Sequence, residues 1–414
     1  MAQRRIVGSA VVATVALLAL ASCGHSAESS SGSTGLDRAS RATSSTRGSA
    51  TTTTQAIGAG STNPIPTLPA PAPGWSQPLT TLPPGGGFTG LSCISDTFCI
   101  AVGGGSSGYG AALTDGSGVT VSWDGAAWSG PSVYLPAPKD GPVSAPILPA
   151  VSCTSGPTCV IVDGSDHASV GDGTNWSTPT ALATAPRLAP NPLDPGSGHP
   201  GSRSAAVSCP TPKLCAAVDN TGQVFTLKNG AWTAPRAFGS PVPTGAAVSL
   251  YQTGRVGISC ASASSCTAVV GLSVLDWNGT SWSLESAPWA PSLPPSGTGT
   301  ADATAIDCPS SSLCAIVSGT GLAYRNGTRS WSPVETIDPH GDLDGISCPT
   351  TSFCMAVDSA GSVLTWNGTS WSDPVSAIPP ARIYTGIGTS VDCTSSRFCL
   401  VMNADGDYAT FAGS

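Results

Sequence analysis

Acidic side chains that could catalyse hydrolysis are scarce in this sequence of 414 residues. A carbohydrate-active hydrolase or lyase needs two carboxyl groups that converge on its substrate. Residues 74–414 contain only two glutamates and no nucleophile elbow, phosphate-binding loop or His-Glu-x-x-His motif. The remaining acidic candidates are Asp166, Asp302, Asp342 and Asp344. We therefore expect a protein that is not an enzyme, with such a hydrolase or lyase as the alternative.

Two short acidic loops offer oxygen atoms to calcium, which takes about six to eight oxygen ligands. The first loop contains Asp338, Asp342 and Asp344, and the second contains Asn403, Asp405 and Asp407. Neither loop has the bidentate glutamate that follows in an EF-hand, and Asp, Asn and Gly are also ordinary turn residues. We expect turns without a cofactor or metal, and a calcium site is the alternative.

One cysteine has the sequence context for lipid attachment. Arg4 and Arg5 precede an apolar stretch, residues 6–20, whose length suits a signal peptide better than a permanent transmembrane helix. The residues Leu20-Ala21-Ser22-Cys23 resemble the lipobox of bacterial lipoproteins. The resemblance implies cleavage of residues 1–22 and acylation of Cys23, for example with palmitate. It also implies a location at the extracytoplasmic face of the bacterial cell membrane, held by the lipid anchor only. A plain secretory signal with a chance cysteine is the alternative.

Residues 23–73 have the composition of a flexible tether. Ser, Thr, Ala, Gly and Pro dominate this segment, and it shows no apolar periodicity. Such a segment cannot bury enough apolar surface to offset its conformational entropy, and its prolines make it stiffer near the end. We expect the tether to hold a folded body, residues 74–414, away from the membrane.

The charge balance argues against nucleic acid as a partner. Charged residues make up 10% of the chain, and the net charge is −8. A phosphate-backbone binder needs a basic face, which this composition does not supply. The apolar fraction of 40% is nevertheless enough for a large folded core.

The fourteen cysteines after Cys23 form seven pairs, each with five residues between its two members. The pairs are Cys93/Cys99, Cys153/Cys159, Cys209/Cys215, Cys260/Cys266, Cys308/Cys314, Cys348/Cys354 and Cys393/Cys399. An exported chain reaches an oxidising compartment, so we expect seven disulfide bonds. Zinc binding is the alternative, but a zinc site needs about four converging ligands, and the chain has only four histidines.

The cysteine pairs mark an internal repeat, because successive first cysteines lie 40 to 60 residues apart. We expect four short strands in each repeat. The first strand ends at the first cysteine, and the second begins at the second cysteine. The third runs into an Asn-Gly or Asp-Gly pair, which predicts a type I′ hairpin turn, and the fourth carries a tryptophan. These tryptophans are Trp128, Trp176, Trp232, Trp282, Trp331 and Trp371.

The second strands predict how the sheets pack. Runs such as Val160-Ile161-Val162 do not alternate with polar residues, so both faces of these strands should be buried. Small four-stranded sheets stacked around an axis meet this condition, and we predict an all-β, seven-bladed propeller with one disulfide per blade. The last repeat lacks its tryptophan strand. The N-terminal strand around Trp75 should therefore complete the seventh blade and close the ring.

The turn sequence Thr365-Trp366-Asn367-Gly368-Thr369-Ser370-Trp371 resembles the Asp-box repeats of bacterial neuraminidase-type propellers, although it is one residue shorter. Kelch propellers also have a tryptophan in the last strand of each blade. Cysteine-paired repeats of this kind look like those of secreted or membrane-anchored actinobacterial proteins. The resemblance implies an architecture for residues 74–414 and assigns no catalytic residue, because the Asp box is a structural motif.

Long proline-rich connections between blades predict the binding face. They cover residues 129–150, 177–205, 233–256 and 283–304, and they should leave the ring on the face opposite the disulfide hairpins. Long loops on a rigid ring usually form its binding surface. The candidate ligand-binding residues are Arg203, Arg255, Asp302, Asp342, Asp344, Tyr384 and Trp289. We expect a monomeric binding or scaffold module for a protein or a cell-envelope polysaccharide.

Overall fold

The computed structural model describes residues 72–80, 87–104, 117–136, 148–182, 204–237, 256–288 and 303–413, apart from short internal gaps. The gaps are residues 157, 165, 220–221, 234–235, 271–272, 287, 328–329 and 383–387. Residues Thr67–Ser414 form one compact unit that contains all described residues. Every regular element in the described part is a β-strand, and no helix there could span a bilayer. The signal peptide, Cys23 and nearly all of the tether lie outside the described residues.

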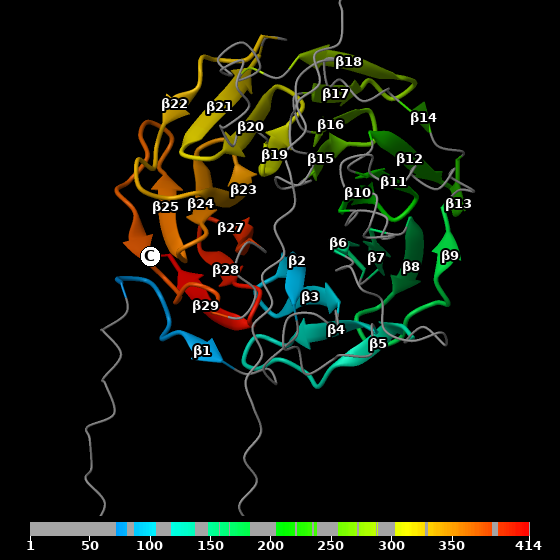
Figure 1. Cartoon of the computed structure of the whole chain (residues 1–414), viewed down its shortest axis with the longest axis horizontal. Helices are drawn as coiled ribbons and strands as arrows, with labels where there is room; N and C mark the ends of the chain where they lie inside the picture. The colour runs from blue at the N-terminus through cyan, green and yellow to red at the C-terminus, as the bar shows by residue number, and fades with distance from the viewer. Residues whose placement is uncertain are drawn as a thin grey trace, which may run out of the picture. The chain divides into compact units, whose positions relative to one another are not determined.

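Seven small antiparallel sheets are arranged in a ring around an axis (Figure 1). Blade 1 contains β2 (Phe88–Ser95), β3 (Phe98–Gly104), β4 (Gly118–Trp123) and β5 (Ser132–Leu135). Blade 2 contains β6 (Ala150–Thr154), β7 (Thr158–Val162), β8 (His167–Gly171) and β9 (Thr180–Ala181). Blade 3 contains β10 (Ala205–Thr211), β11 (Leu214–Asp219), β12 (Gln223–Lys228), β13 (Ala231–Trp232) and β14 (Arg236–Ala237). Blade 4 contains β15 (Val256–Ser262), β16 (Ser265–Val270), β17 (Ser273–Trp277) and β18 (Trp282–Ser286).

The last three blades complete the ring. Blade 5 contains β19 (Ala305–Ser310), β20 (Leu313–Ser318), β21 (Gly321–Asn326) and β22 (Glu335–Thr336). Blade 6 contains β23 (Leu343–Thr350), β24 (Phe353–Asp358), β25 (Ser362–Trp366) and β26 (Val375–Ser376). Blade 7 contains β27 (Ser390–Ser395), β28 (Phe398–Met402), β29 (Asp407–Ala412) and β1 (Leu79–Thr80). The first strand of each blade lies at the centre and the fourth lies at the rim (Figure 1).

The ring is closed by pairing the two ends of the described chain, as predicted. Strand β1 pairs with β29, with Leu79 opposite Tyr408, and Trp75 forms a bridge with Phe411 just before it. Trp75 is buried and its indole ring lies 5.4 Å from the Phe411 ring. The first strand of blade 7, β27, also lies beside β2 of blade 1. Blade 7 is therefore built from both ends of the propeller.

Apolar side chains fill the spaces between neighbouring blades. Between blades 2 and 3, for example, Val160 and Val162 of β7 pack with Val207 of β10 and Ala217 of β11. The second strands are buried on both faces because each sheet is covered by a blade on either side. This packing confirms the interpretation of the non-alternating apolar runs.

The predicted disulfides are all present, one in each blade, between the first and second strands. Paired Cα atoms lie 3.9 to 4.0 Å apart, and Cys93 lies directly opposite Cys99 in the register of β2 and β3. The five-residue spacing thus corresponds to one short hairpin closed by a disulfide. The cysteines form these bonds instead of the zinc sites of the alternative. The seven bonds are Cys93/Cys99, Cys153/Cys159, Cys209/Cys215, Cys260/Cys266, Cys308/Cys314, Cys348/Cys354 and Cys393/Cys399.

The second cysteine of each pair also belongs to the buried core. Between blades 2 and 3, for example, Cys215 packs in one cluster with Val160 and Ala217. The sulfur atoms therefore fill space between blades as well as closing the hairpins, and they are structural residues rather than sites for a ligand. The seven buried second cysteines are Cys99, Cys159, Cys215, Cys266, Cys314, Cys354 and Cys399.

The prediction that the fourth strand carries the tryptophan is wrong for most blades. In six blades a proline follows the tryptophan by two or three residues: Pro78, Pro131, Pro179, Pro235, Pro333 and Pro374. Proline has no N–H for the ladder, so the fourth strand is broken there into a short contact and a separate two- to four-residue strand, apart from Pro235, which lies outside the described residues. Blade 4 lacks this proline and its strand β18 runs without a break.

A hydroxyl side chain compensates for the break in the fourth strand. The residue after the tryptophan is Ser or Thr in these six blades. In blade 6, the Ser372 N–H donates to the Thr365 carbonyl at 2.9 Å, and the Thr365 N–H donates to Ser372 Oγ at 3.0 Å. The same exchange joins Ser76 to Thr410 in blade 7. The side-chain oxygen thus replaces the backbone carbonyl that a regular strand would supply.

The type I′ turn is also wrong for most blades. Only at Asn229-Gly230 do both residues have positive φ, 52° and 84°, and this hairpin has the two-residue turn. In blade 6, Asn367 instead accepts the N–H groups of Thr369 and Ser370 on its Oδ1, which closes a four-residue loop. An Asn side chain can bond the backbone N–H groups that follow it, as here, or the Asn residue can adopt the positive φ of a type I′ turn. Asn-Gly alone therefore does not determine the loop length.

Candidate functional site at the channel mouth

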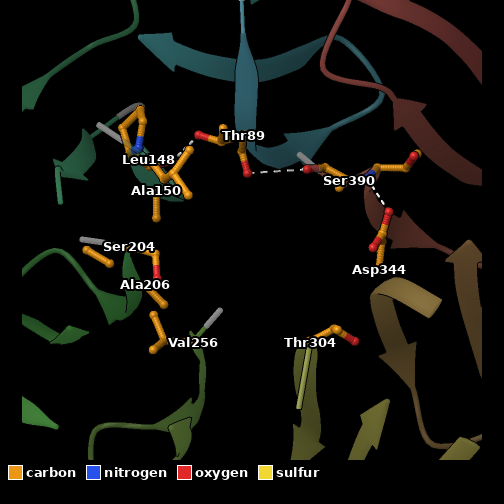
Figure 2. Close-up of a pocket in the computed structure, with 13 residues that line it drawn as sticks. Thr89, Leu148, Ala150, Ser204, Ala206, Val256, Thr304, Asp344 and Ser390 are labelled. Carbon is orange, nitrogen blue, oxygen red and sulfur yellow. Dashed lines mark hydrogen bonds between the residues drawn. The ribbon is translucent and has the colours of Figure 1, made fainter. Parts of the chain in front are cut away.

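A cavity of about 190 Å³ opens at one end of the central channel. Its walls are the first residues of the innermost strands, and all seven blades contribute (Figure 2). The lining residues are Thr89, Leu148, Pro149, Ala150, Ser204, Ala205, Ala206, Val256, Thr304, Asp344, Gly388, Thr389 and Ser390. Each of these residues follows a connection from the preceding blade, so the cavity lies at the face where these connections enter.

Hydrogen bonds between adjacent blades hold the rim of this cavity. Thr89 donates from Oγ1 to the Pro149 carbonyl at 2.6 Å, and Thr304 donates to the Leu343 carbonyl at 2.6 Å. Asp344 accepts the Thr389 N–H on Oδ2 at 2.9 Å (Figure 2). Small side chains and bonded hydroxyls therefore shape a rigid opening.

One of the predicted ligand-binding residues lines the cavity in the described structure. Asp344, on β23, is buried in its wall. Asp342 lies in the exposed turn just before β23, where its carbonyl accepts the Ser359 N–H. Arg203, Arg255, Asp302, Tyr384 and Trp289 lie outside the described residues.

The acidic side chains of the hydrolase alternative do not form a pair in the described part of the cavity. Asp344 is the one carboxylate among the described lining residues. Asp166 lies in the turn between β7 and β8, where its N–H donates to the Asp163 carbonyl. Asp302 lies outside the described residues. General acid–base chemistry with two carboxyl groups therefore has no visible support at this site.

The two acidic loops act as turns. Asp338 accepts the N–H groups of His340 and Gly341 on Oδ1, at 3.2 and 2.9 Å. Asn403 accepts the N–H groups of Asp405 and Asp407 on its Oδ1. Within the described ranges, no three His, Cys, Asp or Glu residues are placed to hold a metal ion. These side chains thus satisfy backbone donors within their own turns.

Below the mouth, a continuous ring of hydrogen bonds joins every blade to the next. The innermost strand of a blade has one edge without a neighbouring strand, so N–H groups on that edge need other partners. The N–H of each first cysteine donates to the side chain that precedes the first cysteine of the previous blade. The acceptors are Ser92, Ser152, Ser208, Ser259, Asp307, Ser347 and Asp392. We call these seven residues the inter-blade belt.

Five serines and two aspartates make up the inter-blade belt. The five serine bonds are all 3.0 Å long. Asp307 accepts the Cys348 N–H at 2.6 Å, and Asp392 accepts the Cys93 N–H at 2.7 Å. The last bond joins blade 7 to blade 1, between residues 299 positions apart in the sequence.

The two belt carboxylates lie in an unusual electrostatic environment. Burial and, to a smaller extent, the nearby charge of Asp307 raise the pKa of Asp392 to about 7, against the opposing hydrogen bonds from Cys93, Ser347 and Cys393. Burial also raises the pKa of Asp307, against the hydrogen bonds from Cys348, Ser259 and Cys308. A small part of each residue stays accessible to solvent, so protons can exchange.

Sequence reasoning missed the belt, although a signal was present. The residue before the first cysteine is Ser or Asp in all seven repeats. The repeat of a short polar acceptor in an apolar strand predicts a buried hydrogen bond. The partner could not be known from one repeat, because the donor belongs to the next blade.

Comparisons with known proteins support the fold. No family model and no curated protein matches the sequence. A structure of YCF48 bound to D1 peptide has a TM-score of 0.52 and 13% identity, and the match covers 82% of this chain and 97% of that one. The WD40 propeller domain of Doa1 has a TM-score of 0.52 and 13% identity, with 81% and 96% covered. A streptogramin B lyase has a TM-score of 0.55 and 9% identity, with 82% and 98% covered. At such identities the similarity shows the fold alone, and that fold is the β-propeller.

Proposed function

We propose that this protein is a lipid-anchored, extracytoplasmic binding module that holds a protein partner at the channel-mouth face. The cavity to which all seven blades contribute is the observation that carries the proposal. Concave sites where several elements converge are the usual places of ligand binding. We therefore assign the mouth face a binding role.

The chemistry of the mouth suits contact with a polypeptide. Ala150, Ala205 and Ala206 line the cavity with small apolar side chains, which leave its volume to a side chain of a partner. The YCF48 propeller was solved with a peptide, which favours a protein over a cell-envelope polysaccharide as the partner class.

The anchor gives the module its place and its reach. Acylation of Cys23 would attach the chain to the membrane, because two or three acyl chains bind stably where one does not. The tether of residues 23–73 would then separate the propeller from the lipid surface. The resulting mechanism is display of a rigid ring whose mouth face is available to partners in the envelope.

The binding face is tested by crosslinking on intact cells followed by mass spectrometry. A Val256→Arg/Ser390→Arg variant fills the mouth with two long charged side chains and should lose the partner captured by the wild type. Ser311→Arg, at the exposed tip of the β19–β20 hairpin, is the matched control and should retain it. Recovery of the same partner by the mouth variant would show that this face is not the binding surface. Competition by purified envelope polysaccharide with no protein captured would overturn the partner class.

The anchor is tested separately with Cys23→Ala and metabolic labelling by a palmitate analogue. The wild type should carry the label, whereas the variant should lose it. A variant that keeps the label would contradict acylation of Cys23 and leave the binding face unaffected.

A further inference from the structure

The junction between blades 7 and 1 depends on a carboxylate where most other junctions use a hydroxyl. Asp392 accepts the Cys93 N–H of blade 1 on Oδ2 at 2.7 Å. Its other oxygen, Oδ1, lies 3.2 Å from Ser347 Oγ of blade 6, which donates to it. Ser347 Oγ in turn accepts the Cys393 N–H at 3.0 Å. One carboxylate thus participates in the bonding of three consecutive blades.

A second carboxylate faces the same region from blade 5. Asp307 accepts the Cys348 N–H on Oδ2 and the Ser259 hydroxyl on Oδ1. Asp307 is the titratable group whose charge raises the pKa of Asp392. The other groups that act on this pKa are the Cys93 and Cys393 amides and the Ser347 hydroxyl. Two negative charges in one buried belt repel each other, and no described basic side chain bonds to either.

Protonation of Asp392 can relieve this repulsion without opening the ring. The neutral acid keeps its carbonyl oxygen, which can still accept the Cys93 N–H. The new O–H on Oδ1 can donate to Ser347 Oγ, which has two lone pairs and already accepts the Cys393 N–H. The belt therefore keeps the number of these hydrogen bonds in both protonation states, with the bond between Ser347 and Asp392 reversed in direction, and it loses one buried charge in the acid form.

We propose that Asp392 is a proton-sensitive latch of the ring, and that proton uptake on this carboxylate stabilises the closed ring by removing a buried charge from the belt. The latch is independent of the partner proposed above. Its physical basis is that the folded state binds this proton more tightly than the unfolded chain does. Stability should thus rise as the pH falls through about 7, and the gain should be complete near the ordinary pKa of an aspartate, about 4.

The test uses the residue that the other blades already have at this position. Asp392→Ser should preserve the bond to the Cys93 amide, as Ser92 and Ser208 do in their own junctions. Thermal melting of the oxidised chain is measured from pH 5 to pH 8.5. The wild type should melt several degrees higher at pH 6 than at pH 8.5, and Asp392→Ser should lose most of this difference. Asp373→Ser, an exposed aspartate, is the control for charge and should keep it.

Amide exchange gives a second readout of the same stability change. Buried amides that exchange by opening of the ring, such as that of Cys93, should exchange more slowly at pH 6 than at pH 8.5 in the wild type, after correction for the intrinsic rate. Asp392→Ser should lose most of this difference. Equal pH dependence of melting in the wild type and Asp392→Ser would overturn the latch. If the serine variant does not fold, a Cys93 amide whose corrected exchange is independent of pH in the wild type would overturn it equally.

Discussion

Substitution of Trp75 tests whether the N-terminal segment closes the whole ring. Trp75 precedes the first repeat in the sequence, but it completes the blade that the last repeat forms. Its side chain is buried against Phe411 of β29. It belongs to an apolar cluster with Val391, Val401 and Ala409 of the same blade. Trp75→Ala removes this side chain while the bonds from Ser76 to Thr410 and from Ala412 to Gly74 can remain.

The expected cost follows from the buried side chain. Truncation of a buried tryptophan to alanine costs about 3–5 kcal/mol, from lost transfer energy and the remaining cavity. A domain of this size loses roughly 2 °C in melting temperature for each kcal/mol, so the melting temperature should fall by about 6–10 °C. Leu79→Ala is the matched control in the same segment, because Leu79 is 49% exposed and should cost less than about 1 kcal/mol.

The assay combines melting with hydrogen exchange measured blade by blade. If closure is cooperative, Trp75→Ala should raise exchange in β2 and β3 of blade 1 as well as in blade 7, because β27 lies beside β2. A decrease in melting temperature of less than about 2 °C, or increased exchange confined to β1 and β29, would refute the reasoning. The N-terminal segment would then stabilise only the outer edge of blade 7.

Two further substitutions test contacts between and within blades. The Arg325 guanidinium bonds both carboxylate oxygens of Asp276, at 2.7 and 2.8 Å, and lies over the Trp331 ring. We expect Arg325→Ala to lower the free energy of unfolding in urea by about 2–4 kcal/mol, because it leaves Asp276 without its partner. A decrease below about 0.5 kcal/mol would show that the ion pair does not stabilise the fold. Gly361→Ala places a Cβ against the Ile378 carbonyl at a position with φ of 81°, so it should lower the free energy of unfolding by about 2 kcal/mol. Gly156→Ala is the control, because its φ is also positive but its Cβ meets open space, and the decrease in the same measurement should be smaller.

Most of the fold could be predicted because each repeat carries the same local signals. The spacing of Cys348 and Cys354 predicts a short hairpin, and the apolar run after the second cysteine predicts burial on both faces. The count of tryptophans led to seven blades and to closure by Trp75, which the pairing of β1 with β29 confirms. Local spacing and periodicity are sufficient for these features because they repeat within about fifty residues.

Local signals were less reliable where two uses of one residue compete. Asn367-Gly368 can form a two-residue turn or an Asx-capped loop, and the loop is found. The prolines after the tryptophans were not used, so the broken fourth strands were missed. At the mouth, Asp344 was the one predicted residue that the described structure places in the cavity wall.

The sequence by itself determined the first three strands of each blade, the disulfide pairing and the number of blades, because these depend on spacing within a repeat. It also indicated the closure of the ring, because the last repeat lacks a tryptophan that Trp75 supplies. The tertiary structure decided which side chains meet at the axis. Asp392 and the Cys93 amide are 299 positions apart, and they are adjacent because the last blade returns to the first. The channel-mouth cavity likewise exists only when seven inner strands converge. Contacts between repeats depend on how the sheets stack, and no single repeat contains that information.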